Sequence, residues 1–204
     1  MASKAGSLTT GPVRLSFPAL KEPKPVSKDK PDDKKFQATL ILPPDMDLKP
    51  FYDAVKAVML ERWGKLIKLP ARNNPIKSND EKELDGYEDG GHFINTRSKR
   101  RPKCVDGKVQ DVIDIEEVFY PGCWVRAHIN AYAWEHPQGG KGVSFGLNAV
   151  QFFKDGERFD GAIDVSEAFD AVPVADDEIF GGDDEVESSL FGGNGDDEGD
   201  EIPF

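Results

Sequence analysis

Residues 120–153 read YPGCWVRAHINAYAWEHPQGGKGVSFGLNAVQFF. Small and apolar side chains occupy every second position of the first half, and they share one face because side chains alternate along a strand. That face continues after the turn sequence HPQGGKG at residues 136–142, so the stretch predicts a long β-hairpin. The apolar face comprises Cys123, Val125, Ala127, Ile129, Ala131, Ala133, Val143, Phe145, Leu147 and Ala149.

The opposite face of the first strand carries large aromatic and hydrogen-bonding side chains. Its members are Trp124, Arg126, His128, Asn130, Tyr132 and Trp134. A half-buried strand normally turns its large apolar residues inward, so this strand inverts the usual pattern. Aromatic platforms with interleaved cations hold single-stranded nucleic acid, which makes this face a candidate binding surface. The alternative is that a loop or another strand covers the two tryptophans as ordinary core.

Length and composition indicate one domain with extensions. The 204 residues are 38% hydrophobic with a mean hydropathy of −0.54, which is typical of a water-soluble protein. The N-terminus lacks the apolar core of a signal peptide and no apolar run is long enough to span a membrane, so we expect a cytoplasmic protein. Two cysteines and three histidines stand at no metal-ligand spacing, so we expect neither a structural metal nor a cofactor.

The net charge of −12 is unevenly distributed. Residues 176–204 contain 12 of the 38 acidic residues and no lysine or arginine, so residues 1–175 are neutral with 26 of each sign. Residues 1–110 hold 22 basic against 15 acidic residues. A basic front and an acidic tail suggest a nucleic-acid-binding protein whose tail opposes that binding.

Upstream of the hairpin, the pattern predicts three short strands and one helix. Two of the strands, Val13–Phe17 and Phe36–Leu42, flank a Pro-rich and charged stretch at residues 21–35 that is typical of a mobile loop. The third is His92–Arg97. Asp47–Gly64 has a capping Asp47, an apolar face including Phe51, Val55, Val58, Met59 and Trp63, and a terminating glycine.

A basic run follows the third predicted strand. Arg97, Lys99, Arg100, Arg101 and Lys103 give five cations in seven residues, and Phe93 lies on the strand before them. Cations that neutralise phosphates supply most sequence-independent affinity for nucleic acid. The alternative is a solvated loop. A weaker second cluster comprises Lys24, Lys28, Lys30, Lys34 and Lys35, interrupted by acidic residues.

Enzymatic chemistry has little support in the sequence. We find no phosphate-binding loop, no serine-hydrolase elbow and no zinc-protease motif. The pair Glu116-Glu117 could ligate the metal of a nuclease, yet no histidine or lysine stands at a sequence spacing from it that is typical of such a site. We therefore expect a protein without catalytic activity.

The last residues, DDEGDEIPF at 196–204, resemble the acidic tip of bacterial single-stranded-DNA-binding proteins. That tip ends in acidic residues followed by Ile-Pro-Phe and the free carboxylate; Gly199 and Glu201 are departures from it. The resemblance implies that Asp200, Glu201, Ile202, Pro203 and Phe204 bind replication or repair proteins.

The body of the chain resembles the OB-fold single-stranded-DNA-binding proteins of tailed phages. The similarity rests on the turn into a strand at Tyr120–Val125, on residues 141–151 and on Asp155-Gly156-Glu157, and it extends over roughly residues 10–170. A simple OB barrel places its helix between strands three and four, whereas Asp47–Gly64 follows only two predicted strands. Either a strand is hidden within residues 21–30 or the helix is peripheral to the barrel.

Together these features predict a mostly β (α+β) protein: an OB-fold-like five-stranded barrel with one helix and long loops. Residues 1–11 would be a flexible N-terminus, residues 12–172 the DNA-binding domain and residues 173–204 a disordered acidic tail. Oligomeric state does not follow from the sequence.

The expected function is to coat single-stranded DNA in phage replication, recombination or repair, in the host cytoplasm. Trp124, Arg126, Tyr132 and Trp134 would contact bases, assisted by Phe93. The cations of residues 97–103 would contact phosphates. Two alternatives remain: an acidic-tailed adaptor whose aromatic face binds protein, and a metal-dependent nuclease.

Overall fold

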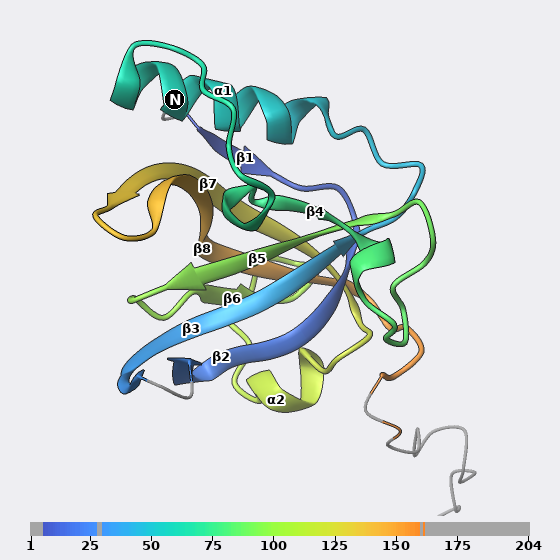
Figure 1. Cartoon of the computed structure of the whole chain (residues 1–204). Coiled ribbons are helices and arrows are strands. Elements are labelled where there is room, and N and C mark those ends of the chain that lie inside the picture. Colours follow the sequence, from blue (N-terminus) through green and yellow to red (C-terminus); the bar gives the residue numbers. More distant parts are fainter. Residues whose placement is uncertain (1–5, 28–29, 160, 162–204) are drawn as a thin grey trace, which may run out of the picture. The chain divides into compact units, whose positions relative to one another are not determined.

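The computed structural model describes residues 6–27, 30–159 and 161 (Figure 1). The chain divides into two units, residues 1–164 and 165–204, and every described residue belongs to the first. In this part of the chain no helix has the length and apolar character needed to cross a membrane.

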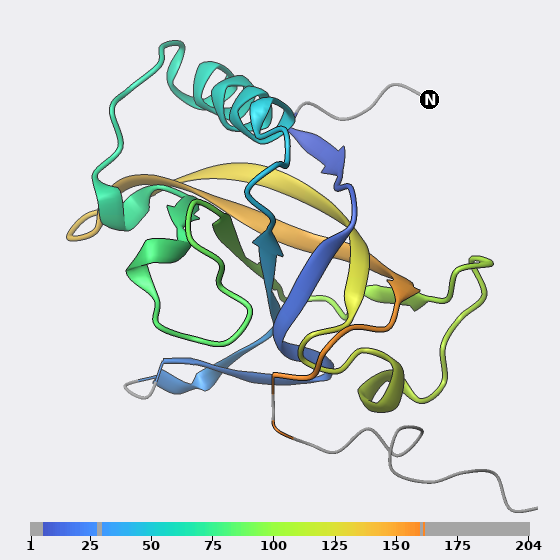
Figure 2. The same cartoon turned by 90° about the vertical axis from the view of Figure 1, so that its right-hand side faces the viewer.

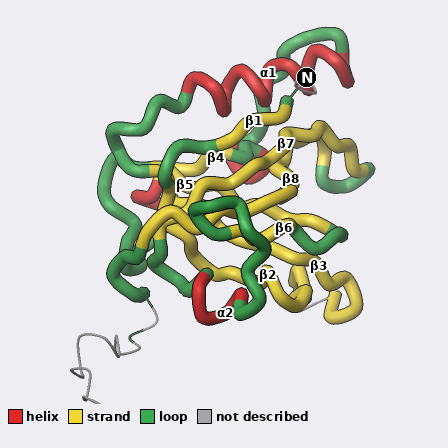
Figure 3. The backbone as a smooth tube through the Cα atoms, turned by 180° about the vertical axis from the view of Figure 1, so that it is seen from behind, coloured by secondary structure: helices red, strands yellow, loops and turns green. Residues whose placement is uncertain are grey.

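Strands dominate the described residues (Figure 3). They are β1 (Ser7–Thr9), β2 (Val13–Ser27), β3 (Lys30–Leu42), β4 (Ile76–Ser78), β5 (His92–Ser98), β6 (Lys103–Val105), β7 (Trp124–His136) and β8 (Gly140–Lys154). The helices are α1 (Lys49–Trp63) and α2 (Ile115–Val118), with 3₁₀ turns η1 (Ala71–Asn73) and η2 (Asn79–Glu81).

Five strands form a closed ring, visible in Figure 2, in the order β2–β3–β5–β8–β7 and back to β2. All contacts in the ring are antiparallel except the short parallel pairing of β5 with β8. Numbered along the chain, the ring strands follow the order 1-2-3-5-4. The predicted five-stranded, OB-fold-like architecture is therefore confirmed.

The hairpin predicted from residues 120–153 is confirmed as β7 and β8, with Tyr132 opposite Ser144 and Trp134 opposite Gly142. The small and apolar side chains of β7 point into the ring, where Val125, Ala127 and Ile129 are fully buried. This face alternates with the polar and aromatic one, as the period of two requires. Burial of the apolar face thus fixes the orientation of the aromatic face outward.

The first ring strand is longer than the sequence suggested. β2 continues past Pro18 to Ser27, and residues 21–27 and 30–35, predicted as a mobile loop, form the arms of a β2–β3 hairpin. The strand survives the proline because a bulge between Ser16 and Ala19 takes up one extra residue. Phe17 occupies that bulge with a φ of 47°. The predicted frayed N-terminus is likewise partly ordered, since β1 pairs with β7.

The predicted helix is confirmed at Lys49–Trp63. The carboxylate of Asp47 accepts a hydrogen bond from the backbone N–H of Lys49 at 2.8 Å. Gly64 ends the helix in the left-handed conformation, with its N–H donating to Leu60 O. Phe51, together with Val55, Val58 and Met59, is buried against the ring, and Trp63 is half-buried at the edge of that contact.

The position of α1 explains the mismatch with a simple OB barrel. Leu42 at the end of β3 pairs directly with His92 at the start of β5. Residues 43–91, including α1, therefore leave the ring and return to it at the same place, and α1 packs outside the ring on β1, β7 and β8. The short helix α2 instead stands between the third and fourth ring strands. The helix predicted from the sequence is the peripheral one.

The two cysteines are buried and free. Burial raises the pKa of the Cys104 thiol to about 11 and that of Cys123 to about 12. Burial of the two neutral thiols therefore contributes fully to the free energy of unfolding below pH 9. This contribution is lost as the pH rises through 11 to 12 and the thiols ionise. We expect neither thiol to react with Ellman's reagent at pH 8 until the protein is unfolded. Rapid reaction of the native protein would contradict the burial.

Candidate nucleic-acid interface

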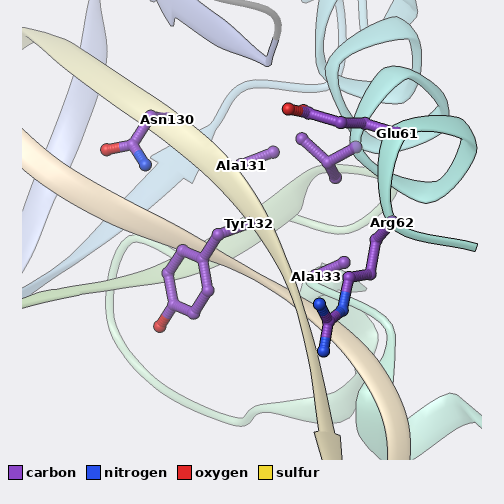
Figure 4. Close-up of a pocket in the computed structure, with 7 residues that line it drawn as sticks. Glu61, Arg62, Asn130, Ala131, Tyr132 and Ala133 are labelled. Carbon is purple, nitrogen blue, oxygen red and sulfur yellow. The ribbon is translucent and has the colours of Figure 1, made fainter.

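The outward face of β7 is separated from helix α1. In Figure 4, Ala131 and Ala133 lie on the side of the strand that faces Glu61 and Arg62 of α1, whereas Tyr132 points away from the helix. A cavity of about 390 Å³ lies between α1 and β7. Tyr132 also lines this cavity, whereas Trp134 belongs to a different surface, which Tyr132 shares.

That surface opens into a cavity of about 320 Å³ that combines aromatic and basic side chains. Tyr132 and Trp134 of β7 line it, together with Asn95 of β5 and Ser144 of β8. Four cations from separate parts of the chain converge on it: Lys35, Arg72, Lys77 and Arg97. No acidic residue of the described part of the chain lines it, so its described lining is strongly positive.

Trp134 is fixed in place by its neighbours on β8. Its indole N–H donates to Ser144 Oγ at 2.9 Å. Its ring covers Gly142, where a Cβ atom would come within 2.2 Å of Trp134 Cζ2. A glycine opposite the tryptophan is thus required by close approach, and the ring is held flat against the sheet while remaining partly exposed.

Two of these cations, Arg72 and Lys77, lie on the segment that leaves and re-enters the ring. The buried amide of Asn73 donates to the carbonyls of Gly139 and Lys141 at 3.0 and 2.9 Å, which docks η1 and its Arg72 onto the tip of the β7–β8 hairpin. Lys77 of β4 stands opposite Phe93 of β5. These contacts join elements that are distant in sequence.

A second cavity, of about 220 Å³, continues the first across the sheet. The two share Asn95 and Arg97, and the second adds Phe17, Gln37, Thr39 and Lys82. Thr39 Oγ1 donates to Asn95 Oδ1 at 2.8 Å, which orients the amide between the two cavities. We call the two cavities together the groove; it runs across β8, β5 and β3 toward β2.

Most cations of the groove lack acidic partners within the described residues. Lys35 lies 3.1 Å from Asp33, but Arg72, Lys77, Lys82 and Arg97 have no carboxylate within 4.0 Å there. Burial lowers the pKa of Lys82, since a desolvated ammonium without a counter-ion is less stable in its charged form. An anion entering the groove would compensate these charges.

The structure separates residues that the sequence placed in one site. Arg97, Tyr132 and Trp134 meet in the groove. Trp124 precedes Trp134 by ten residues on β7, which is a distance of roughly 33 Å along an extended strand. Trp124 is half-buried near Arg14 and Lys154, whose cationic centres lie 5.4 and 5.2 Å from its ring centroid. Arg126 is exposed between the two ends of the strand.

Only the first cation of the run at residues 97–103 lines the groove. Lys99 and Arg100 are exposed on the turn after β5. Arg101 and Lys103 line a separate cavity of about 310 Å³ beside Asp111 and Ile115. The run therefore spreads over more than one face.

Phe93 requires a correction, because it is buried and unavailable for stacking on a base. Its side chain is 2% exposed and packs with Ile41 and Tyr87. The Tyr87 ring meets it edge to face at 5.6 Å, and Lys82 Nζ lies 4.4 Å from its centroid. Phe93 lies on the same outward face of β5 as Arg97, but residues 82–87 cover that face around Phe93. The side chain of Phe93 is therefore buried although it points out of the ring.

Several groove residues had no signal in the sequence. Arg72, Lys77 and Lys82 lie in an irregular, polar segment, and Phe17 appeared to be the end of a short strand. Among the groove cations, Lys35 and Arg97 did belong to clusters recognised in the sequence.

Other predicted sites fall outside the groove. The proposed tip Asp200–Phe204 lies outside the described residues. Of the acidic pair considered as a metal site, Glu116 accepts a hydrogen bond from Lys21 at 2.7 Å. No group of three or more His, Cys, Asp or Glu suited to a metal occurs in residues 6–27, 30–159 and 161.

Comparison with known proteins relates the chain to phage proteins. The family model described as Enterobacter phage Enc34, ssDNA-binding protein matches residues 6–180. Putative protein p50 of Acyrthosiphon pisum secondary endosymbiont phage 1 is 33% identical over 177 residues, covering 81% of this chain and 94% of that protein.

Two solved structures extend the comparison to the fold. The single-stranded DNA-binding protein from bacteriophage Enc34 matches with a TM-score of 0.66 and 26% identity, over 82% of this chain and 92% of that one. The structure of that protein in complex with ssDNA matches with a TM-score of 0.65 and 24% identity, over 76% and 90% of the respective chains.

Proposed function

This chain belongs to the family of single-stranded-DNA-binding proteins represented by that of Enterobacter phage Enc34, and we propose that it binds single-stranded DNA along the groove, without catalysis. The observation that carries the proposal is the convergence of Tyr132 and Trp134 with four cations on a surface that no carboxylate of residues 6–27, 30–159 and 161 lines. The cations are Lys35, Arg72, Lys77 and Arg97.

Each part of the groove matches one feature of a single strand. Aromatic rings stack on bases of any sequence, each stack contributing about 1–3 kcal/mol. Cations neutralise phosphates and release counterions, which supplies affinity that falls with salt. In OB folds generally, oligonucleotides bind across the second and third strands and beside the loops joining strands one to two and four to five. The groove lies over β3 and β5, which are the second and third ring strands, and beside the β7–β8 turn.

We further propose that the protein coats single-stranded DNA during phage replication, recombination or repair in the host cytoplasm. The tip Asp200–Phe204 would recruit replication or repair proteins. Support for the recruitment comes from the sequence DEIPF, in which acidic residues precede an aromatic C-terminus. Trp124, Arg126, Lys99, Arg100, Arg101 and Lys103 would contact a longer strand that continues beyond the groove.

The direct test is a titration of the full chain with labelled oligo-dT, an RNA of equal length and a duplex. Single-stranded DNA should bind most tightly, quench tryptophan fluorescence and remain uncleaved in the presence of magnesium. Salt should weaken the binding steeply. Absence of oligo-dT binding would contradict the proposed function, and cleavage would favour a nuclease instead.

The salt dependence also tests which cations contact phosphates. Replacing Arg97 by alanine should lower the slope of log affinity against log salt by about 0.7, the value for one contact to a single strand. The double variant Arg100→Ala/Arg101→Ala should leave the slope unchanged with an oligonucleotide that only fills the groove. With a much longer oligonucleotide it should lower the slope too. An unchanged slope for Arg97→Ala would remove that residue from the interface.

A further inference from the structure

Phe17 is exposed in a backbone conformation that is costly for it. Its φ of 47° lies in the left-handed region, and Pro18 follows it, although a residue before proline favours extended conformations. Such residues cost roughly 1–3 kcal/mol and persist where their surroundings hold them, often at functional sites. The Phe17 side chain is nevertheless 55% exposed, so its ring adds little packing to offset the cost.

Lys82 places a cation beside this ring. Its Nζ lies 5.4 Å from the Phe17 centroid, 4.9 Å from that of Tyr87 and 4.4 Å from that of Phe93. The ammonium is half-buried, and the hydrogen bond that it donates to Tyr87 Oη is long at 3.4 Å. Three aromatic rings thus hold a charge that no described carboxylate neutralises.

The pair lies at the end of the groove remote from Trp134. Phe17 and Lys82 line the second cavity with Gln37, Asn95 and Arg97. Asn95 accepts a hydrogen bond from Thr39 through its carbonyl oxygen, and its amide nitrogen carries two further donor hydrogens. This end of the groove therefore offers a ring face, a desolvated cation and amide donors together.

We propose that Phe17 and Lys82 form a nucleotide subsite of their own, in which a base of single-stranded DNA stacks on the Phe17 ring and its phosphate lies against Lys82. The inference rests on the proposed function and adds a stacking residue on the first ring strand. The bulge at residues 16–19 then has a role, because it turns the aromatic side chain of Phe17 toward the groove.

Packing alone accounts less well for the same facts. Glycine would adopt the left-handed conformation without strain, and a phenylalanine kept for its hydrophobicity would be buried. A lysine kept as a surface charge would not lie over three rings. A base and a phosphate satisfy all three observations at once.

The subsite sets the length of DNA that the groove spans. From Trp134 on β7 to Phe17 on β2, the path crosses β8, β5 and β3, which is four inter-strand steps or roughly 19 Å. At about 3.4 Å per stacked nucleotide this distance holds five to six nucleotides. An oligonucleotide of two or three nucleotides cannot occupy both ends.

Oligonucleotide length therefore separates the subsite from the rest of the groove. Phe17→Leu keeps the Cβ atom and apolar volume but removes the ring, whereas Phe17→Trp keeps a stacking face. With dT8, Phe17→Leu should bind about 5- to 150-fold more weakly than the parent, and Phe17→Trp should bind like the parent. With dT3, which can bind at Trp134 alone, the loss should be much smaller.

Two further variants complete the test. Lys82→Met retains the apolar stem and should lower the salt slope by about 0.7 with dT8. Tyr52→Ala, which removes an exposed aromatic from α1, should change nothing. Thermal unfolding of each variant checks that the five-stranded ring of the fold is intact. Failure of the parent to bind dT8 would contradict the proposed function; a parent that binds and a folded Phe17→Leu of equal affinity would overturn the subsite alone.

Discussion

Replacing Trp134 by alanine is expected to weaken oligo-dT binding by about 1–3 kcal/mol, because the variant removes the largest stacking surface of the groove. The effect should be large because the ring is already fixed by Ser144 and Gly142 and loses little freedom on binding. Fluorescence quenching or anisotropy with labelled oligo-dT at one fixed salt concentration measures it.

A second variant displaces the ring without removing it. Alanine at Gly142 would place a Cβ atom 2.2 Å from Trp134 Cζ2, so the indole must move off the sheet. Gly142→Ala should therefore weaken binding in the same direction as Trp134→Ala.

The matched control is Trp124→Ala, the same substitution at the other end of β7. Trp124 lies between Arg14 and Lys154, so its loss should lower thermal stability with little change in affinity for a short oligonucleotide. Equal binding losses from the two tryptophan variants with a short oligonucleotide would contradict our placement of the groove.

Deleting residues 176–204 is expected to tighten DNA binding at low salt by about tenfold. These residues carry 12 negative charges and no positive ones, so we expect them to compete with DNA phosphates for the groove. A short flexible tether gives an effective concentration of the order of 1 mM, and a competitor with a Kd of about 0.1 mM would then occupy the groove about ten times more often than not. The gain should shrink as salt screens the competition. Oligo-dT titrations of the parent and the deletion variant at several salt concentrations measure this.

Deleting Phe204 alone separates recruitment from competition. It removes one ring and leaves all 12 acidic side chains, so DNA affinity should stay within twofold of the parent. Capture of replication or repair proteins on immobilised protein should be lost in this variant, as in the longer deletion. If the Phe204 deletion retained every partner, the tail would act through charge only.

The hairpin could be predicted from sequence because its signal is local. Alternation with a period of two needs only neighbouring residues, and burial of residues such as Val125 and Ile129 then orients Tyr132 and Trp134 outward. The five-stranded architecture followed from the resemblance, which the ring confirms.

The prolines of β2 made the predicted strand too short. Pro18, Pro23 and Pro25 suggested a strand end and a loop, yet all three lie within the strand. Beyond Arg14 the pairings of β2 are with β3. Its other edge has no strand partner there among the described residues, so a proline without an N–H donor is tolerated. Whether a strand pairs on one side or on both is decided by the topology of the sheet, which the local sequence does not encode.

The groove was only partly predictable for the same reason. Arg97, Tyr132 and Trp134 lie on strands with a clear pattern, but Arg72, Lys77 and Lys82 reach the groove through contacts between distant elements. The burial of Phe93 likewise depends on Tyr87, which folds back over β5. No spacing rule reports such long-range contacts.

The excursion of residues 43–91 between two directly paired strands also has a cost in chain entropy. A hairpin joining β3 to β5 could be closed by about four residues, and closing 49 instead costs about 2 kcal/mol more by the logarithmic dependence on loop length. Burial of Phe51, Val55, Val58 and Met59 of α1 offsets that cost. The same excursion carries Arg72, Lys77 and Lys82, so these three cations of the groove reach their places only when residues 43–91 are ordered.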